Sequence, residues 1–135
     1  MTDIKEIWQV CEEEGIRIDT IDCKACSSFS IMYGGNCFIA VSSALPERLL
    51  KEHTAHEVGH CVKGAFYNEN APLDLVSQHE YRADKWAIEK LIPKDQLVRE
   101  ITKNGNDNLY LLSECFGVSE DFIKKACIYY GLYIE

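Results

Sequence analysis

The sequence has no apolar run long enough to cross a membrane, and its first residues, Met1–Glu6, show no basic segment followed by an apolar stretch. A membrane-spanning protein, or one exported by a standard leader, is therefore not expected. Internal repeats and low-complexity linkers are also absent, and 135 residues provide for one hydrophobic core rather than two ordinary domains. We expect a single domain over residues 1–135 in the cytoplasm, with a core in about 1–92 and a helical segment in about 93–135.

Basic side chains are scarce: Lys and Arg number 14 against 22 Asp and Glu, which gives a formal net charge of -8. Nucleic-acid binding relies on clustered Lys and Arg that neutralise phosphates, so this balance disfavours a nucleic acid as the principal ligand. The charge is compatible with a basic protein partner, although many acidic proteins have none. Composition alone predicts no oligomeric state.

Paired cysteine motifs are missing as well. Cys23-Lys24-Ala25-Cys26 is a CxxC motif without a second pair at zinc-ribbon spacing, so a closed zinc site made of four cysteines is not indicated. We interpret the seven cysteines as free thiols that fill small core sites in a reducing compartment, and their odd number favours this interpretation. A second metal or redox role, with Cys37 or another cysteine completing a site, stays open as the alternative.

Hydrophobic periodicity and turn residues predict an α+β fold with a helix, a small sheet and then further helices. Asp3 and Glu6 form a capping box, and Gly15 is the expected helix end. Alternating residues indicate three strands, which we expect to pair as an antiparallel sheet with a tight Gly34-Gly35 hairpin turn. The predicted strands are residues 16–21, 29–33 and 37–41, and the later predicted helices are about 46–64, 78–91, 95–103, 108–115 and a segment capped by Ser119.

The most informative motif is His56-Glu57-Val58-Gly59-His60, inside the predicted helix 46–64. Residues four apart in a helix lie one turn apart on the same side, so a metal ion can bridge the imidazoles of His56 and His60. Glu57 lies on the adjacent flank, where a carboxylate can act as general base toward water without being a ligand. A chance occurrence of this string, or a purely structural His pair, is the competing interpretation.

Two further residues of this helix bear on the site. A glycine inside a helix costs about 1 kcal/mol relative to alanine, so we expect a neighbouring backbone to approach Gly59 closely. His53 lies one turn before His56. We expect it to stand beside the site without ligating, because a fourth protein ligand would close the position that water needs.

The next predicted helix carries two carboxylates on or beside its core-facing stripe. Glu80 and Asp84 lie where an ionised carboxylate is unfavourable unless a cation compensates its charge. We predict Glu80 as third ligand, beside the two histidines, of a site for one Zn2+ ion, and Asp84 as acceptor of the free ring N–H of a ligand histidine. His79 is the competing third ligand, and a solvated helix edge is the alternative for both carboxylates. The stripe consists of Ala83, Trp86, Ala87 and Leu91.

Three motifs together resemble the ImmA/IrrE family of bacterial and phage-borne metallopeptidases. They are H-E-V-G-H at 56–60, E-Y-R-A-D-K-W-A-I-E-K-L-I-P at 80–93 and F-G-V-S-E-D-F-I at 116–123. The resemblance implies a small, cytoplasmic, zincin-like peptidase that cleaves a helix-turn-helix repressor encoded by a phage or mobile element. It also implies zinc ligands at His56, His60 and Glu80, with Glu57 as the catalytic residue.

The zinc peptidases that this chain resembles hold their substrate extended along an edge strand above the metal helix. Residues 37–41 are the candidate here, with Cys37, Ile39 and Val41 as substrate-binding residues. Spacing does not select a residue that stabilises the oxyanion, and the candidates are Tyr67, His79 and Tyr81.

The last two predicted helices resemble a helix-turn-helix and supply the rival function, a DNA-binding module. The second of them begins Ser119-Glu120-Asp121, which would bring acidic side chains against phosphate. We therefore expect this segment to pack against the core or to dock the substrate protein. A metal-stabilised regulator without catalytic activity is the other alternative, because function does not follow from fold.

Overall fold

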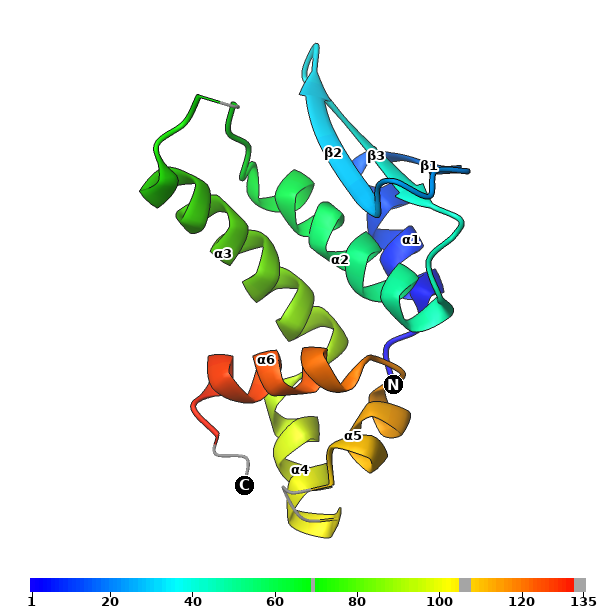
Figure 1. Cartoon of the computed structure of the whole chain (residues 1–135), viewed down its shortest axis with the longest axis vertical. Helices are drawn as coiled ribbons and strands as arrows, with labels where there is room; N and C mark the ends of the chain where they lie inside the picture. Colours follow the sequence, from blue (N-terminus) through cyan, green and yellow to red (C-terminus); the bar gives the residue numbers. More distant parts are fainter. Residues whose placement is uncertain (69, 105–107, 133–135) are drawn as a thin grey trace.

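The computed structural model describes residues 1–68, 70–104 and 108–132, and its elements follow the predicted α+β order (Figure 1). Residue 69, inside the loop predicted before the Glu80 helix, lies outside the described residues. The elements are α1 (Ile4–Glu14), β1 (Arg17–Ile21), β2 (Ser28–Tyr33), β3 (Asn36–Ser42), α2 (Glu47–Lys63), α3 (Leu73–Leu91), α4 (Lys94–Asn104), α5 (Leu109–Phe116) and α6 (Glu120–Tyr130).

Local signals set most element ends as predicted. The Asp3 side chain accepts from the Lys5 N–H, Glu6 completes the capping box, and Gly15 ends α1 in the left-handed conformation. The helix that carries Glu80 begins earlier than the predicted residue 78. It starts at Leu73 directly after Pro72, whose fixed φ suits a helix start.

The sheet is mixed, so the prediction of an antiparallel sheet is wrong for one strand. The strand order is β1-β3-β2: β2 pairs antiparallel with β3, whereas β1 pairs parallel with it. The connection 22–27 crosses the end of β3, where the Ser42 N–H donates to the Ser27 carbonyl and the Ser42 hydroxyl donates to the Cys23 carbonyl. This crossing brings β2 to the far side of β3 and leaves β3 in the centre of the sheet.

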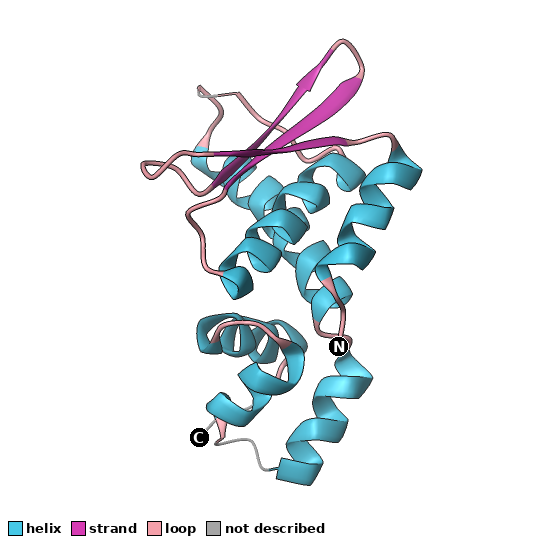
Figure 2. Cartoon of the chain, turned by 90° about the vertical axis from the view of Figure 1, so that its right-hand side faces the viewer, coloured by secondary structure: helices cyan, strands magenta, loops and turns pink. Residues whose placement is uncertain are grey.

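The sheet forms a layer across the helices (Figure 2), and the β2–β3 hairpin extends beyond them. Gly34 and Gly35 form the hairpin turn with φ values of 59° and 79°, as the two-residue turn requires. Side chains on the inner face of β3 belong to the same buried cluster as residues of α1 and α2. This packing fixes β2 and β3 above α2.

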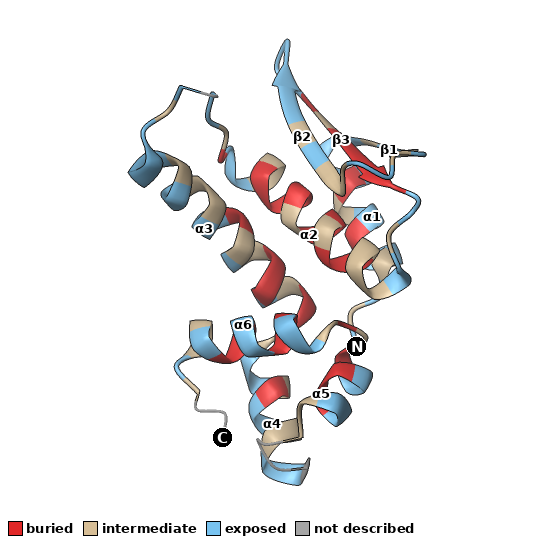
Figure 3. Cartoon of the chain, viewed as in Figure 1, coloured by how far each residue is buried: buried red, intermediate tan, exposed pale blue. Residues whose placement is uncertain are grey.

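Helices α2 and α3 pack side by side, and buried residues gather along their facing sides (Figure 3). A Cβ atom on Gly59 of α2 would lie only 2.6 Å from the carbonyl oxygen of Ala83 in α3. The predicted close approach of a backbone to Gly59 is therefore confirmed. It brings the motif of α2 against the carboxylates of α3.

The prediction that all seven cysteines are free is wrong for two of them. Cys37 of β3 and Cys61 of α2 form a disulfide, with Cα atoms 5.9 Å apart. The other five cysteines are free thiols, among them Cys23 and Cys26 of the CxxC motif. The disulfide ties the centre of the sheet to the residue after His60, a contact between segments whose proximity depends on the fold and not on a local motif.

The C-terminal helices α4, α5 and α6 lie at one end of α2 and α3 (Figure 1). Ser119 caps α6 as predicted, accepting from the Phe122 N–H, and its hydroxyl also contacts the buried Glu52 of α2 at 2.7 Å. Arg48 of α2 pairs with Glu114 of α5 at 2.7 Å. Within the described residues, no helix has both the length and the apolar character needed to cross a bilayer.

Candidate metal centre

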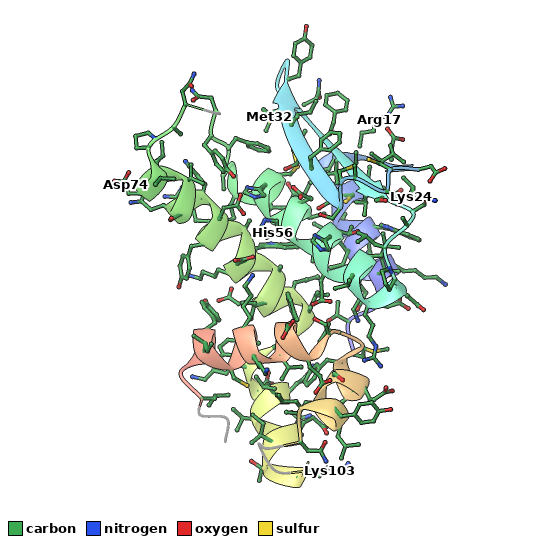
Figure 4. All side chains as sticks on the ribbon, in the orientation of Figure 1. Arg17, Lys24, Met32, His56, Asp74 and Lys103 are labelled. Carbon is green, nitrogen blue, oxygen red and sulfur yellow. A yellow bond between two sulfur atoms is a disulfide. The ribbon has the colours of Figure 1, made fainter. Side chains whose placement is uncertain are left out.

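Three nitrogen and oxygen donors from α2 and α3 converge on one point. His56 lies on the side of α2 that faces α3 (Figure 4), and its Nε2 is 3.2 Å from Nε2 of His60. Glu80 of α3 reaches both rings, with carboxylate oxygens 2.8 Å from His56 Nε2 and 3.3 Å from His60 Nε2. The potential ligand atoms of His56, His60 and Glu80 all lie within 4.8 Å of one another.

The outer ring nitrogens of both histidines are held by acceptors. Nδ1 of His56 is 2.8 Å from Asp84 Oδ1, and Nδ1 of His60 is 2.5 Å from the Ala65 carbonyl oxygen. Because a carbonyl only accepts, His60 carries a proton on Nδ1, and the carboxylate of Asp84 favours a proton on Nδ1 of His56 as well. In the neutral form of both rings, the Nε2 lone pairs then face Glu80. This donor set of two imidazoles and one carboxylate fits a zinc ion. Asp84 is in contact with His56, and its role in orienting a ligand histidine stays a prediction.

Charged contacts connect His56 to α6, because Asp84 lies against both His56 and Lys125. Burial disfavours the charged imidazole, but the hydrogen bond and charge of Asp84 outweigh it and raise the pKa of His56. Burial acts to raise the pKa of Asp84, but hydrogen bonds with His56 and Lys125 lower it overall. Nζ of Lys125 in α6 is 3.1 Å from Asp84 Oδ2. Helix α6 therefore contacts the candidate metal centre through the ion pair of Lys125 with Asp84.

Among the residues predicted as candidates to stabilise the oxyanion, Tyr67 is the one in contact with the donor group. Its hydroxyl donates to Glu80 Oε1 at 2.6 Å, and this contact raises the pKa of Tyr67 to about 12. Burial opposes ionisation of Glu80, yet Tyr67 and the two imidazoles lower the pKa of its carboxyl. Tyr81 instead contacts the ring of Tyr129, with centroids 6.2 Å apart. Of the two tyrosine candidates, Tyr67 is the one that lines the same cavity as His56, His60 and Glu80.

The two other histidines lie outside the donor group. His79 stacks on Tyr67 with ring centroids 6.1 Å apart, and its buried Nδ1 has no hydrogen-bond partner among the described residues. His53 Nδ1 lies 3.4 Å from the hydroxyl of Ser28. Glu80, and not His79, thus occupies the third position of the group, although its role as a ligand stays a prediction.

Glu57 is held by two residues that sequence reasoning missed. Ser28 donates to its Oε2 and Ser30 to its Oε1, each at 2.7 Å, while the Glu57 residue is only 7% exposed. The two serines alternate with exposed residues along β2. That alternation places both on one face of a strand, but nothing local in the sequence shows that this face looks onto α2.

A cleft of about 280 Å³ brings these groups together. One wall is formed by α2 and α3, which carry the two histidines, Glu57 and Glu80. The other wall is β2, which contributes Ser28, Phe29 and Ser30. The chemistry available in the cleft is a metal held by three donors, next to a carboxylate that can accept a proton.

The prediction that residues 37–41 form the edge strand for substrate is wrong. These residues belong to β3, which has a partner strand on each side, so its backbone has no free edge for a peptide. Their side chains are also buried in the core: Cys37, Ile39 and Val41 are 7%, 2% and 1% exposed. The error follows from strand order, because the crossover of the 22–27 connection makes β2 an edge strand in place of β3.

Comparison with known proteins agrees with this fold. Residues 11–127 match the sequence profile of peptidase family M78, described as the IrrE N-terminal-like domain. A solved structure, a Mycobacterium tuberculosis transcriptional regulator, is similar with a TM-score of 0.68 and 13% identity, over 91% of this chain and 40% of that one. This chain thus spans less than half of that protein, and the likeness shows the fold alone. No curated protein matches by sequence. The profile match confirms the resemblance found from the motifs: the chain belongs to the IrrE N-terminal-like family, with a metallopeptidase-type fold.

Proposed function

We propose that this chain is a zinc-dependent endopeptidase that cleaves a cytoplasmic helix-turn-helix repressor of a phage or mobile element. The proposal rests above all on the convergence of His56, His60 and Glu80 beside the buried carboxylate of Glu57. Three protein donors leave a coordination position for water, which is the pattern of catalytic zinc sites and not of closed structural ones. Family membership supports the reaction class, and the resemblance to repressor-cleaving relatives supports the substrate class.

The residues around the cleft have defined roles in this reaction. When bound, zinc would supply a Lewis acid that polarises the scissile carbonyl and activates water. Glu57 takes the proton of the attacking water and returns it to the departing amine. Tyr67 remains protonated at neutral pH, because its pKa is about 12, and can donate to the negative charge that develops on the carbonyl oxygen.

Strand β2 is the surface along which we place the substrate. Among the described residues, β2 pairs only with β3, so its other edge is open for an added strand. Ser28 and Ser30 of β2 line the same cleft as His56 and Glu80. A peptide paired with this edge would pass directly over the donor group.

Incubation of the zinc-loaded protein with the repressor encoded nearest to its gene tests the proposal, with mass spectrometry detecting new termini. We expect one new pair of termini with the unmodified protein and none with Glu57→Gln, although that variant keeps stoichiometric zinc. Cleavage by Glu57→Gln at the unmodified rate would remove Glu57 as the base. Zinc binding without cleavage of any candidate repressor would favour a non-catalytic regulator.

The rival DNA-binding function has less support. The first turn of α6, where a recognition helix would approach DNA, carries the exposed acidic residues Glu120 and Asp121. We therefore expect no salt-sensitive affinity for random duplex DNA in a filter-binding titration.

A further inference from the structure

We propose that Ser28 and Ser30 are positioning residues that hold the Glu57 carboxylate in a fixed orientation toward the cleft. This inference rests on the proposed function, because it assumes that Glu57 is the proton acceptor. It goes further in assigning to β2 a second role, in holding Glu57, beside the substrate binding proposed for its open edge.

Each of the two serines forms a hydrogen bond with a different oxygen of the Glu57 carboxylate. Ser28 donates to Oε2 and Ser30 to Oε1, both at 2.7 Å, so neither oxygen can turn away without breaking a contact. Hydrogen bonds to an ionised acceptor are among the stronger ones in proteins. Within the described residues Glu57 forms no ion pair with Lys or Arg, so these hydroxyls are its nearest compensation for burial.

The two serine hydrogen bonds leave the Glu57 carboxylate with free lone pairs that can accept a proton. A carboxylate oxygen has two lone pairs, and each serine uses one of them, so the carboxylate keeps acceptor capacity toward the cleft. Ser28 also contacts His53 Nδ1 at 3.4 Å. Because the Ser28 hydroxyl donates to Glu57, a hydrogen bond in this contact requires a proton on Nδ1 of His53.

The register of the sheet determines that serines face Glu57. Ser28 is opposite Val41 and Ser30 is opposite Ile39 in β3, and the inner-face residues of β3 are buried. A slip by one residue would replace the serines with Phe29 and Ile31. The hydroxyls are therefore placed by the backbone pairing of β2 with β3, and the edge proposed for substrate binding belongs to the same strand.

Binding of acetohydroxamic acid to the zinc-loaded protein tests this inference without a known substrate. This small chelator loses its hydroxyl proton to a nearby base when it binds zinc, so its affinity reports on Glu57. We expect Glu57→Gln to weaken binding by at least tenfold and the double variant Ser28→Ala/Ser30→Ala by about tenfold. Zinc affinity, measured by competition with a chelating dye, should change less than about threefold in both, because the ligands are untouched.

Two comparisons separate positioning from a general loss of structure. The double variant Ser28→Thr/Ser30→Thr keeps both hydroxyls on a residue that suits strands, and should bind acetohydroxamic acid within about threefold of the unmodified protein. Ser27→Ala removes the adjacent hydroxyl, which makes no hydrogen bond to Glu57 in the described structure, and should have no effect. If the double alanine variant does not fold, Ser30→Ala alone should lose about threefold.

The outcomes distinguish this inference from the proposed function. Unchanged acetohydroxamic acid affinity in the folded double alanine variant, together with weakened binding by Glu57→Gln, would overturn the role of the serines and leave Glu57 as the base. Unchanged affinity in Glu57→Gln would overturn both. Loss in the alanine variant with recovery in the threonine variant is the result that the structure predicts.

Discussion

The two walls of the cleft place their functional groups in different ways. The helical wall, formed by α2 and α3, carries His56, His60 and Glu80, and the spacing within the motif of α2 already sets two of these donors on one side. The strand wall is β2, whose serines reach Glu57 only because the sheet holds β2 above α2. The proposed metal site therefore depends mainly on helix geometry, whereas the position of Glu57, the proposed base, depends on strand register.

The largest difference between the walls should appear in zinc binding. His56→Ala or Glu80→Ala removes a donor from the helical wall, so we expect neither variant to retain stoichiometric zinc after gel filtration, as measured by elemental analysis. Ser28→Ala/Ser30→Ala, on the strand wall, should retain one zinc per chain. Full occupancy in Glu80→Ala would exclude that residue from the site.

The disulfide between Cys37 and Cys61 connects the sheet to the helical wall and should contribute strongly to stability. It closes a loop with a sequence separation of 24, for which the chain-entropy estimate is a few kcal/mol. We expect Cys37→Ser/Cys61→Ser to lower the free energy of unfolding in denaturant by about 2–4 kcal/mol under non-reducing conditions. Unfolding in excess reductant serves as control, because the two proteins should then be similar. Equal midpoints without reductant would contradict the role of the disulfide.

Gly59→Ala should weaken the contact that aligns the two helices of the helical wall. The added Cβ would lie 2.6 Å from the Ala83 carbonyl oxygen, a backbone atom that cannot rotate away. We expect a loss of about 1–3 kcal/mol in the free energy of unfolding, with weaker zinc binding, because α3 must shift and carries Glu80 with it. Lys63→Ala, at an exposed position of the same helix, provides the control. Unchanged stability in Gly59→Ala would show that the helices are not in close contact there.

The smallest effect is expected from Lys125, which contacts the helical wall from α6. Its side chain is 53% exposed, so solvent screens the ion pair with Asp84. Lys125→Met should lower the free energy of unfolding by about 0.2–1 kcal/mol, measured by thermal denaturation with Lys124→Met as the control. A loss of more than about 2 kcal/mol would show that the contact of Lys125 with Asp84 supports the helical wall more strongly than an exposed ion pair can.

These differences explain which parts of the site could be predicted from the sequence. The spacing of His56 and His60 fixes their common side by local geometry. Glu80 and Asp84 lie beside a core-facing stripe, which by itself predicts that a cation or a partner compensates their charge. The close approach at Gly59 followed from the unfavourable energy of glycine inside a helix. In each case the signal is contained within one helix, where the 3.6-residue period relates sequence directly to space.

The errors share a different origin, in contacts between distant segments. The order of the strands depends on the path of the connection 22–27, which no local pattern specifies, so the sequence alone does not show that β3 is central. The serines of β2 and the disulfide of Cys37 depend on the same arrangement of sheet and α2. An alternating pattern assigns residues to the two faces of a strand, but it does not determine which element packs against each face.

Anomalous diffraction from crystals of the zinc-loaded protein tests the central claim most directly. One zinc ion is expected at about 2.0–2.1 Å from Nε2 of His56 and of His60 and at about 2.0–2.2 Å from the Glu80 carboxylate, with Glu57 nearby but not coordinated. A zinc ion bound by His79 in place of Glu80, or held at the CxxC motif of Cys23 and Cys26 with the donor group empty, would contradict it.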